Sequence, residues 1–275
     1  MVQISGRTKI TGIFGYPVEH TLSSVIHNAA FKSLGLDYCY VPFLVHPDYL
    51  NDAVKAIKAL NLHGVNVTIP HKEKVMPLLD EIHEEASFIG AVNTIVNSDG
   101  KLIGYNTDGK GFIQSLLENH IPFENKDILI IGAGGAARAV SYYLCQKAKT
   151  LNIYNRTKER AERLVQDLKK ISNNVSLTED ISSLERFHLI INATPLGLKK
   201  EDSLPFDTSL LKKEQIVCDL IYKKTRLIKE AAKKGCFILD GIDMLLWQGT
   251  LAFELWTGIR PDIKVMKNAL KKIKT

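Results

Sequence analysis

The chain has 275 residues, of which 45% are hydrophobic and 24% are charged, and its formal net charge is +6. This composition is typical of a globular protein with one large or two medium-sized domains, and we find no internal repeat or low-complexity segment. No apolar run reaches the roughly 18 residues of a membrane span, and residues 1–11 lack the apolar core of a signal peptide. We therefore expect a cytoplasmic protein with no membrane partner.

The cysteines and the basic residues narrow the class further. The four cysteines show no zinc or CxxC spacing, which predicts reduced thiols and no disulfide; they are Cys39, Cys145, Cys218 and Cys236. The histidines show no ligand spacing, so we expect no metal. The densest basic segment, residues 264–274, is typical of a solvated helix face, and we expect no nucleic-acid partner.

The first hundred residues alternate between strand and helix patterns, which predicts an α/β domain. The expected strands are 10–16, 38–44 and 63–67, and the expected helices are 23–34, 47–60 and 72–80. Ser23 or Ser24 is expected to cap the first helix. Two further strands, 91–97 and 101–104, flank Ser98-Asp99-Gly100, which is a hairpin signal. A helix over 111–119 then links two domains.

From residue 127 the alternation is regular and predicts a doubly wound, mostly parallel sheet. The expected strands are 127–131, 151–154, 175–177, 188–192, 216–220 and 237–240, and the expected helices are 136–147, 157–170 and 226–234. Two amphipathic helices, 244–256 and 263–273, follow without an intervening strand. We expect them to pack back on the first domain.

A glycine-rich turn joins the strand that ends at Ile131 to the next helix. Gly132 permits a tight turn, Gly134 lets the backbone approach a pyrophosphate, and Ala137 allows close packing of helix and strand. The free N–H groups and the positive dipole end of the helix favour phosphates. The expected cofactor-binding residues here are Gly132, Ala133, Gly134, Gly135 and Ala136.

The end of the next strand predicts which dinucleotide binds. An NAD site usually has Asp or Glu there for the ribose diol, whereas this chain has Asn155, Arg156 and Thr157. A guanidinium can bind a 2′-phosphate with two parallel hydrogen bonds, so the pair of motifs predicts an NADP site. The alternative is an ion pair between Arg156 and Glu159 or Glu162 on its own helix.

Polar residues gather at the expected strand ends and tight turns, in segments 20–23, 66–72, 91–94 and 106–109 and at Gln248. Ligands bind at strand carboxyl ends in α/β domains. Hydroxyls, amides, one lysine and one aspartate suit a small polyhydroxylated acid.

The order of these motifs resembles that of the shikimate dehydrogenase family over nearly the whole chain. The matching segments are Asn66-Val-Thr-Ile-Pro-His-Lys72, Ala91-Val-Asn-Thr94, Asn106-Thr-Asp-Gly109, Gly132-Ala-Gly-Gly-Ala-Ala-Arg138, Asn155-Arg-Thr157 and Asn192-Ala-Thr194. The resemblance implies reduction of 3-dehydroshikimate to shikimate with NADPH, in aromatic amino-acid synthesis.

The resemblance also implies roles for single residues. Lys72 is the catalytic lysine and Asp108 is its partner. Substrate contacts are implied for Thr21, Ser23, Thr68, Asn93 and Gln248, with Tyr222 as a further candidate. Cofactor contacts are implied for Asn155, Arg156 and Thr157 at the 2′-phosphate, for Thr194, and for Gly241, which begins the segment beside the nicotinamide.

The residue chemistry is consistent with these roles. A lysine ammonium beside the carbonyl oxygen stabilises the developing alkoxide and can donate the proton. A nearby carboxylate keeps the lysine oriented and charged. The alternatives are an ordinary first-turn helix lysine at Lys72 and a turn or N-cap residue at Asp108.

Several positions depart from the family pattern. Thr21 stands for the usual Ser, Ser24 for Pro, and Asp243 for Gly. These departures leave open a quinate/shikimate dehydrogenase that accepts NAD, and more remotely a non-catalytic NADP-binding protein. The expected substrate domain is 1–109 with 242–275, the expected NADP domain is 110–241, and the active site is expected between them. We expect a monomer or homodimer.

Overall fold

The computed structural model describes residues 4–273, which form two compact units. Unit 1 holds the described residues up to Thr107 and those from Leu246 onward, and unit 2 is Asp108–Leu245. The first boundary lies at the start of α4 (Asp108–Glu118) and the second lies within α8 (Ile242–Thr257). The sequence places these boundaries two residues later and four residues earlier.

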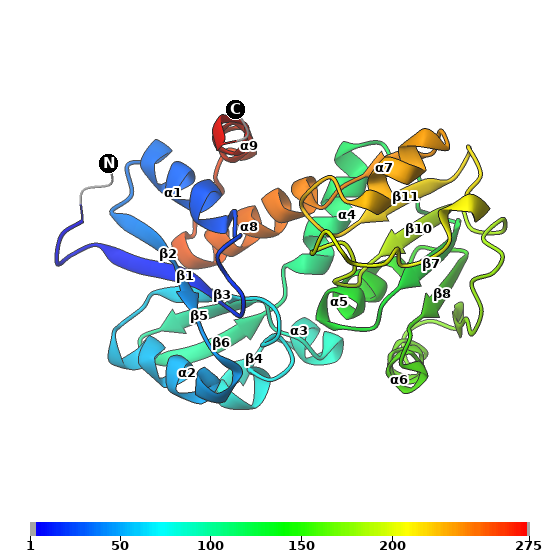
Figure 1. Cartoon of the computed structure of the whole chain (residues 1–275). Coiled ribbons are helices and arrows are strands. Elements are labelled where there is room, and N and C mark those ends of the chain that lie inside the picture. The colour runs from blue at the N-terminus through cyan, green and yellow to red at the C-terminus, as the bar shows by residue number, and fades with distance from the viewer. Residues whose placement is uncertain (1–3, 274–275) are drawn as a thin grey trace. The chain divides into compact units, whose positions relative to one another are not determined.

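Unit 1 contains a mixed six-stranded sheet with the order β2-β1-β3-β5-β6-β4 (Figure 1). Its strands are β1 (Lys9–Gly15), β2 (Tyr38–Leu44), β3 (Gly64–Val67), β4 (Glu81–Ile82), β5 (Thr94–Ser98) and β6 (Lys101–Tyr105). The β1 strand is parallel to β2 and β3, whereas β5 is antiparallel to both of its neighbours. The expected hairpin is present, since Asp99 and Gly100 both have positive φ, as a tight two-residue turn requires.

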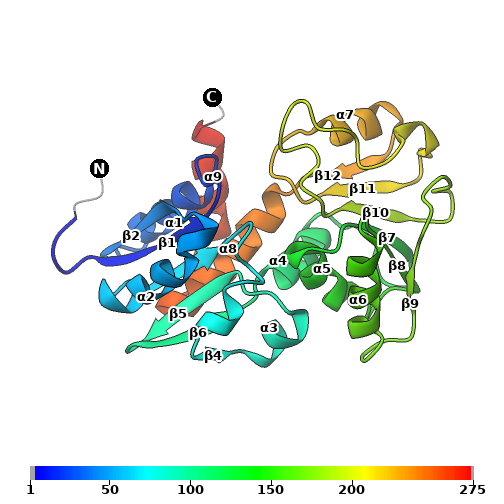
Figure 2. The same ribbon diagram turned by 60° about the horizontal axis from the view of Figure 1, so that its bottom comes forward.

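Helices cover both faces of this sheet. They are α1 (Ser23–Ser33), α2 (Leu50–Ala59), α3 (Glu84–Ile89), α8 and α9 (Ile263–Ile273), with short 3₁₀ turns at Pro47–Tyr49 and Met76–Leu78. Figures 1 and 2 show α1, α8 and α9 on one face and α2 on the other. The C-terminal helices pack on the first domain, as expected, because α9 lies against α1.

Two expectations for unit 1 are wrong. Residues 72–80 form no α-helix but a series of turns, which includes the 3₁₀ turn Met76–Leu78. Pro77, which has no N–H to donate, lies within that turn. Ser23 is the first residue of α1 rather than its cap, and neither it nor Ser24 caps the helix, because Leu22 precedes it without a side-chain hydrogen bond. The elements β4 and α3 were not predicted, because they are too short to show a hydrophobic period.

Unit 2 contains a six-stranded sheet with the order β12-β11-β10-β7-β8-β9, and every pairing is parallel. Its strands are β7 (Asp127–Ile131), β8 (Thr150–Tyr154), β9 (Val175–Leu177), β10 (Leu189–Asn192), β11 (Ile216–Asp219) and β12 (Phe237–Leu239). The chain starts at β7, runs to one edge, and returns to the other side of β7 at β10. This reversal defines the doubly wound dinucleotide-binding order, with the ligand crevice at the carboxyl ends of β7 and β10.

The helices of unit 2 follow from right-handed crossovers between parallel strands. The helices α5 (Gly135–Leu144) and α6 (Lys158–Leu168) lie on one face, next to α4, and α7 (Arg226–Lys233) lies on the other (Figure 2). A fully buried cluster beneath α7 includes Leu129, Ile190 and Val217 from three adjacent strands. These strands are continuous apolar runs because both of their faces are covered.

All four cysteines are free and buried. In residues 4–273 no helix is both long enough and apolar enough to cross a membrane. The same residues contain no group of three or more His, Cys, Asp or Glu side chains arranged to hold a metal ion.

Candidate functional site

Asn93 is the centre of a buried polar cluster in unit 1, immediately before β5. Its Oδ1 accepts hydrogen bonds from the Thr107 amide at 2.8 Å and from the Thr94 hydroxyl at 2.9 Å. Its Nδ2 donates to the Thr107 hydroxyl at 2.9 Å and, over a longer 3.5 Å, to Oε1 of Gln248 on α8. The fold therefore brings Asn93 and Gln248 together, although they are 155 positions apart.

Asn66, near the end of β3, makes three hydrogen bonds that connect this cluster to β2 and β5. Its Nδ2 donates to the Asn93 carbonyl at 3.1 Å and to the Thr94 hydroxyl at 3.0 Å, and its Oδ1 accepts from the Tyr40 hydroxyl at 2.8 Å. Asn66 belongs to one of the motifs in the sequence, but no role was predicted for it. Its burial at a strand end, at 4% exposure, is the signal that marks it.

The loops after β1 and β3 carry three more expected substrate residues. The Thr21 hydroxyl accepts a hydrogen bond from the backbone N–H of Ser23 at 3.2 Å, so the threonine serves the turn as a serine would. The two loops are joined because the Tyr16 amide donates to the Ile69 carbonyl at 3.0 Å. Thr68 is half-buried beside them, and its methyl group fills the space next to Gly15.

Lys72 is half-buried in the turns after β3, and its carbonyl accepts from the Val92 amide at 2.8 Å. The first-turn helix alternative does not apply, because no helix forms there. The neighbouring His71 is fully buried, and its Nε2 donates to the Val45 carbonyl at 2.8 Å. Burial lowers the pKa of His71, which keeps it neutral and structural.

Asp108 begins α4 in unit 2 and is only 4% exposed. A carboxylate in the first turn of a helix is favoured by the helix dipole. The next residue must be small, since a Cβ on Gly109 would lie 2.4 Å from the Ala139 carbonyl oxygen of α5. This contact fixes the start of α4 against α5 and with it the backbone position of Asp108.

The glycine turn after β7 has the geometry of a phosphate cradle. Gly132 has φ +121°, and a Cβ on it would lie 2.8 Å from the Ala193 carbonyl oxygen, so only glycine fits. Gly134 precedes α5, and nothing lies within 4 Å of the place where its Cβ would stand. The backbone at Gly134 therefore faces open space at a helix N-terminus, which suits a pyrophosphate.

Arg156 is exposed at the end of β8, and among residues 4–273 its side chain has no hydrogen bond or ion pair. Glu162 pairs instead with Lys158, so the alternative of an ion pair to Arg156 on α6 is absent. Asn155 donates from Nδ2 to the Thr157 carbonyl at 2.8 Å, which shapes the turn. The guanidinium is therefore available to a ligand anion.

The carboxyl ends of β10, β11 and β12 carry Thr194 and Gly241. The Thr194 hydroxyl donates to Oδ1 of Asn192 at 2.7 Å and accepts from the Leu196 amide at 3.2 Å. A Cβ on Gly241 would lie 2.4 Å from the Leu220 carbonyl oxygen, so the segment after β12 passes directly over the segment after β11. Tyr222 lies in that second segment and is 39% exposed.

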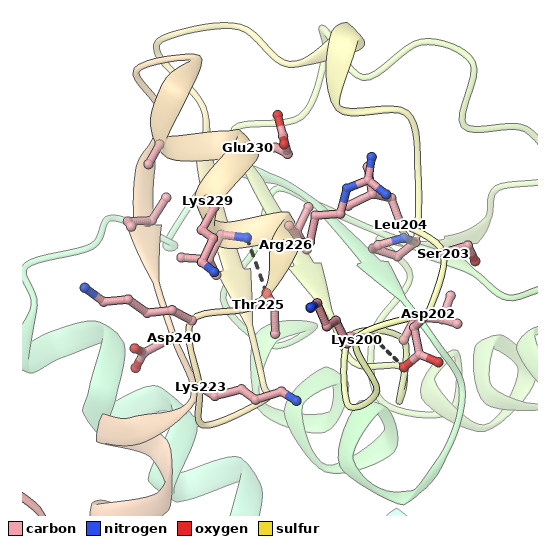
Figure 3. A pocket seen from close by; sticks show the side chains of 18 of the residues that line it. Lys200, Asp202, Ser203, Leu204, Lys223, Thr225, Arg226, Lys229, Glu230 and Asp240 are labelled. Carbon is pink, nitrogen blue, oxygen red and sulfur yellow. Dashed lines mark hydrogen bonds between the residues drawn. The ribbon is translucent and has the colours of Figure 1, made fainter. Parts of the chain in front are cut away.

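A hollow of about 920 Å³ lies beside these loops in unit 2. Figure 3 shows that its lining comes from α7, the segment before it and the loop after β10. Its rim is basic; the cations are Lys199, Lys200, Lys223, Lys224, Arg226, Lys229 and Lys233. No residue that the sequence predicted for the site lines it, but Thr225 connects it to the buried end of β11.

The carboxylate of Asp243 accepts a hydrogen bond from a side chain of unit 2. The Asn119 side chain, just beyond α4, donates from Nδ2 to Oδ2 of Asp243 at 2.9 Å. The carboxylate that departs from the family pattern is thus bound within unit 2.

A doubly wound sheet with a phosphate cradle and an available arginine, joined to a second α/β unit with a buried amide and hydroxyl cluster, defines a nicotinamide-dinucleotide-dependent oxidoreductase. Three family models match the chain. They are described as "Shikimate dehydrogenase substrate binding domain" (residues 13–95), "Shikimate / quinate 5-dehydrogenase" (115–197) and "Shikimate 5'-dehydrogenase C-terminal domain" (241–271). The chain belongs to the shikimate dehydrogenase family.

Individual relatives are similar over almost their whole length. The NADP⁺ shikimate dehydrogenase of Carboxydothermus hydrogenoformans is 47% identical over 276 residues, covering 98% of this chain and 99% of the relative. A crystal structure of a shikimate dehydrogenase with NADP⁺ has a TM-score of 0.92 at 43% identity, covering 99% and 98%. The Thermus thermophilus enzyme, solved with NADP(H) and shikimate, has a TM-score of 0.88 at 36% identity, covering 96% and 99%.

Proposed function

We propose that this chain catalyses the reversible NADPH-dependent reduction of 3-dehydroshikimate to shikimate, in the pathway to chorismate and the aromatic amino acids. Near full-length similarity to NADP⁺ shikimate dehydrogenases carries the assignment. The available Arg156 beside Asn155, with no acid to bind a ribose diol, supports NADP over NAD.

NADPH, when bound, supplies the hydride that reduces the ring carbonyl. The glycine turn Gly132–Ala136 suits its pyrophosphate, and Asn155, Arg156 and Thr157 suit its 2′-phosphate. Thr194 and Gly241 are assigned to its nicotinamide half. The open space over Gly134 and the steric need for Gly132 fit such a ligand.

Lys72 is assigned as the proton donor to the carbonyl oxygen. Its ammonium stabilises the negative charge that develops on that oxygen as the hydride arrives, and then transfers a proton to it. Asp108 is assigned as the carboxylate that orients the ammonium and favours its charged form. In the reverse direction the neutral Lys72 amine takes the proton back from the substrate hydroxyl.

The remaining polar residues are assigned to the substrate. Thr21 and Ser23 suit the carboxylate, because their hydroxyls and the helix that begins at Ser23 favour an anion. The hydroxyl and amide groups of Thr68, Asn93 and Gln248 suit the ring hydroxyls, and Tyr222 is assigned beside them. The hydrogen bonds of Asn66 hold Asn93 in place for this role.

A four-way steady-state assay tests the proposal, with shikimate and quinate each offered NADP⁺ and NAD⁺. We expect shikimate with NADP⁺ to give the highest kcat/KM. A higher value for quinate, or for NAD⁺, would assign the chain to the quinate/shikimate branch instead. Binding of NADPH without turnover of any substrate would support a non-catalytic protein.

The cell compartment and assembly are part of the same proposal. Four free, buried cysteines suit the reducing cytoplasm, where we place the enzyme as a monomer or homodimer. Sedimentation equilibrium on the purified enzyme distinguishes the two states, and a larger assembly would contradict both.

A further inference from the structure

Asp219, the last residue of β11, is a carboxylate that the reaction leaves without a role. It is 1% exposed and lies at the carboxyl edge of the unit 2 sheet. Within residues 4–273 no cation pairs with it, and the charge that acts on it is the like charge of Asp240. Burying a carboxylate without a compensating cation costs folding free energy, so a buried acid of this kind is expected to have a purpose that its hydrogen bonds reveal.

The Oδ1 atom of Asp219 holds the loop after β10. It accepts from Nδ2 of Asn192 at 3.0 Å, and Oδ1 of Asn192 in turn accepts from both the amide (3.1 Å) and the hydroxyl (2.7 Å) of Thr194. The Nδ2 of Asn192 also donates to the Leu196 carbonyl at 3.2 Å. Asp219 thus fixes Thr194 through a single intervening side chain.

The same carboxylate holds the segment on which Gly241 rests. Its Oδ1 also accepts from the Ile221 amide at 3.2 Å, and the Ile221 carbonyl accepts from the Gly241 amide at 3.1 Å. Its Oδ2 accepts from the Thr225 hydroxyl at 2.6 Å, and that hydroxyl caps α7 by accepting from the Ile228 amide. Figure 3 shows Thr225 at the start of α7.

We infer that Asp219 is a positioning residue for the nicotinamide half of NADPH, because its Oδ1 ties together the loops that carry Thr194 and Gly241 while its Oδ2 accepts from Thr225 at the start of α7. The inference rests on the proposed cofactor contacts of those two residues. Asp219 is not assigned a contact with any substrate or cofactor atom. Preorganised contacts lower the cost of ordering loops when a ligand binds, and loosening them weakens binding.

The groups that surround Asp219 act on its pKa in opposite directions. Burial raises its pKa to about 6, Asp240 adds to the rise, and the hydrogen bonds from Thr225, Ile221 and Asn192 oppose it. Asp240 is itself engaged at the start of α8, where its Oδ1 accepts from the Ile242 amide at 3.0 Å.

The test compares Asp219→Ala, Asp219→Asn and a matched control, Asp127→Ala. Asp127 lies at the opposite end of the same sheet, where it accepts from the Thr150 hydroxyl at 2.8 Å and from Lys149 at 3.2 Å. Calorimetric titration gives the Kd of NADP⁺, steady-state kinetics give KM for 3-dehydroshikimate, and thermal melting gives stability.

Asp219→Ala is expected to raise the Kd of NADP⁺ about tenfold or more, which corresponds to roughly 1.4 kcal/mol, with KM for 3-dehydroshikimate within about twofold of wild type. Asp219→Asn is expected to retain most of the affinity, because its Oδ1 still accepts from Asn192 and Ile221. Asp127→Ala is expected to lower the melting temperature without changing the Kd of NADP⁺.

An unchanged Kd in a folded Asp219→Ala protein would overturn the inference, as would equal losses in Asp127→Ala. If Asp219→Ala does not fold, Asn192→Ala removes the side chain that links Oδ1 of Asp219 to Thr194, and an unchanged Kd of NADP⁺ in that variant has the same meaning. Wild-type activity with NADP⁺ tests the proposed function separately, so the two failures are distinguishable.

Discussion

The indole Nε1 of Trp256, on α8, donates a hydrogen bond to the carbonyl oxygen of Ile95, on β5, at 3.0 Å across 161 positions of sequence. The space for this contact exists because residue 64 is glycine. A Cβ on Gly64 would lie 2.3 Å from that Nε1 and 2.5 Å from the Ile95 oxygen. The hydrogen bond attaches α8 to β5, one of the two central strands of the unit 1 sheet.

We predict that Gly64→Ala and Trp256→Phe each destabilise unit 1. The alanine displaces the indole, and the phenylalanine removes the only N–H that the indole side chain can donate to Ile95. Loss of a partner to a buried polar group costs about 1–3 kcal/mol, which urea unfolding measures. Gly6→Ala is the control, because nothing lies within 4 Å of its Cβ position. Equal effects at positions 6 and 64 would show that the indole contact contributes nothing.

Lys72→Ala is expected to lower kcat by about 10²–10⁴-fold, since a positioned general acid contributes that much. The Kd of NADPH should change little, because the lysine acts on the substrate oxygen. Lys74→Ala is the control for charge, as it lies two residues away and is exposed. Near-normal turnover of Lys72→Ala in single-turnover kinetics would remove the residue from the mechanism.

Arg156→Ala is expected to raise KM for NADPH about 10- to 100-fold and to leave KM for NADH unchanged. Hydrogen bonds to a charged group contribute about 1.5–3 kcal/mol, and NADH has no 2′-phosphate to receive them. Arg163→Ala, on the exposed face of α6, should preserve the preference for NADPH. A mutant at position 156 that still prefers NADPH as strongly as wild type would contradict the assignment.

His27 makes the stability of unit 1 sensitive to acid. Its ring is fully buried, stacks on Tyr40 with centroids 4.5 Å apart, and has no hydrogen-bond partner for either nitrogen in the described chain. Burial lowers its pKa from 6.5 to about 3, so the unfolded chain binds a proton between these values and the folded chain does not. Stability is therefore expected to fall as pH falls below 6.5, by about 1.4 kcal/mol per pH unit.

The measurement is urea unfolding between pH 7 and pH 4 for wild type and His27→Phe, which keeps a flat apolar ring. Asp219 acts in the opposite sense over part of this range, because its folded pKa of about 6 exceeds its unfolded value of 3.8. It is present in both proteins, so its effect cancels in the difference. Parallel curves for the two proteins would refute the role of His27.

The sheet of unit 2 was predictable because its central strands are buried on both faces and are rich in apolar residues, and because strand and helix patterns alternate regularly around them. The expected ranges 127–131 and 175–177 match β7 and β9 residue for residue. Residues 72–80 were wrongly predicted as a helix, because an apolar spacing compatible with one turn of helix also occurs in the turns around Pro77. Tertiary contacts, such as the hydrogen bond from the Val92 amide to the Lys72 carbonyl, determine the conformation of residues 72–80.

The expected site residues were found from motif order, which records chemistry but not the hydrogen bonds behind it. Asn66 stood in a motif without a role, and its contacts with Asn93 and Tyr40 depend on strands that are distant in sequence. Asp219 gave a weaker signal, a single acid at the end of an apolar strand. Its importance appears only when three loops meet at the sheet edge.

The interruption of unit 1 by unit 2 has a consequence for how a newly made chain matures. Translation delivers the whole of Asp108–Leu245 before Trp256 and the helix that packs on α1. Unit 2 can therefore fold while the first hundred residues still lack α8 and α9, the helices that pack on the unit 1 sheet and are synthesised last. On the ribosome, unit 2 can therefore complete its fold before unit 1 does, although unit 1 begins earlier in the sequence.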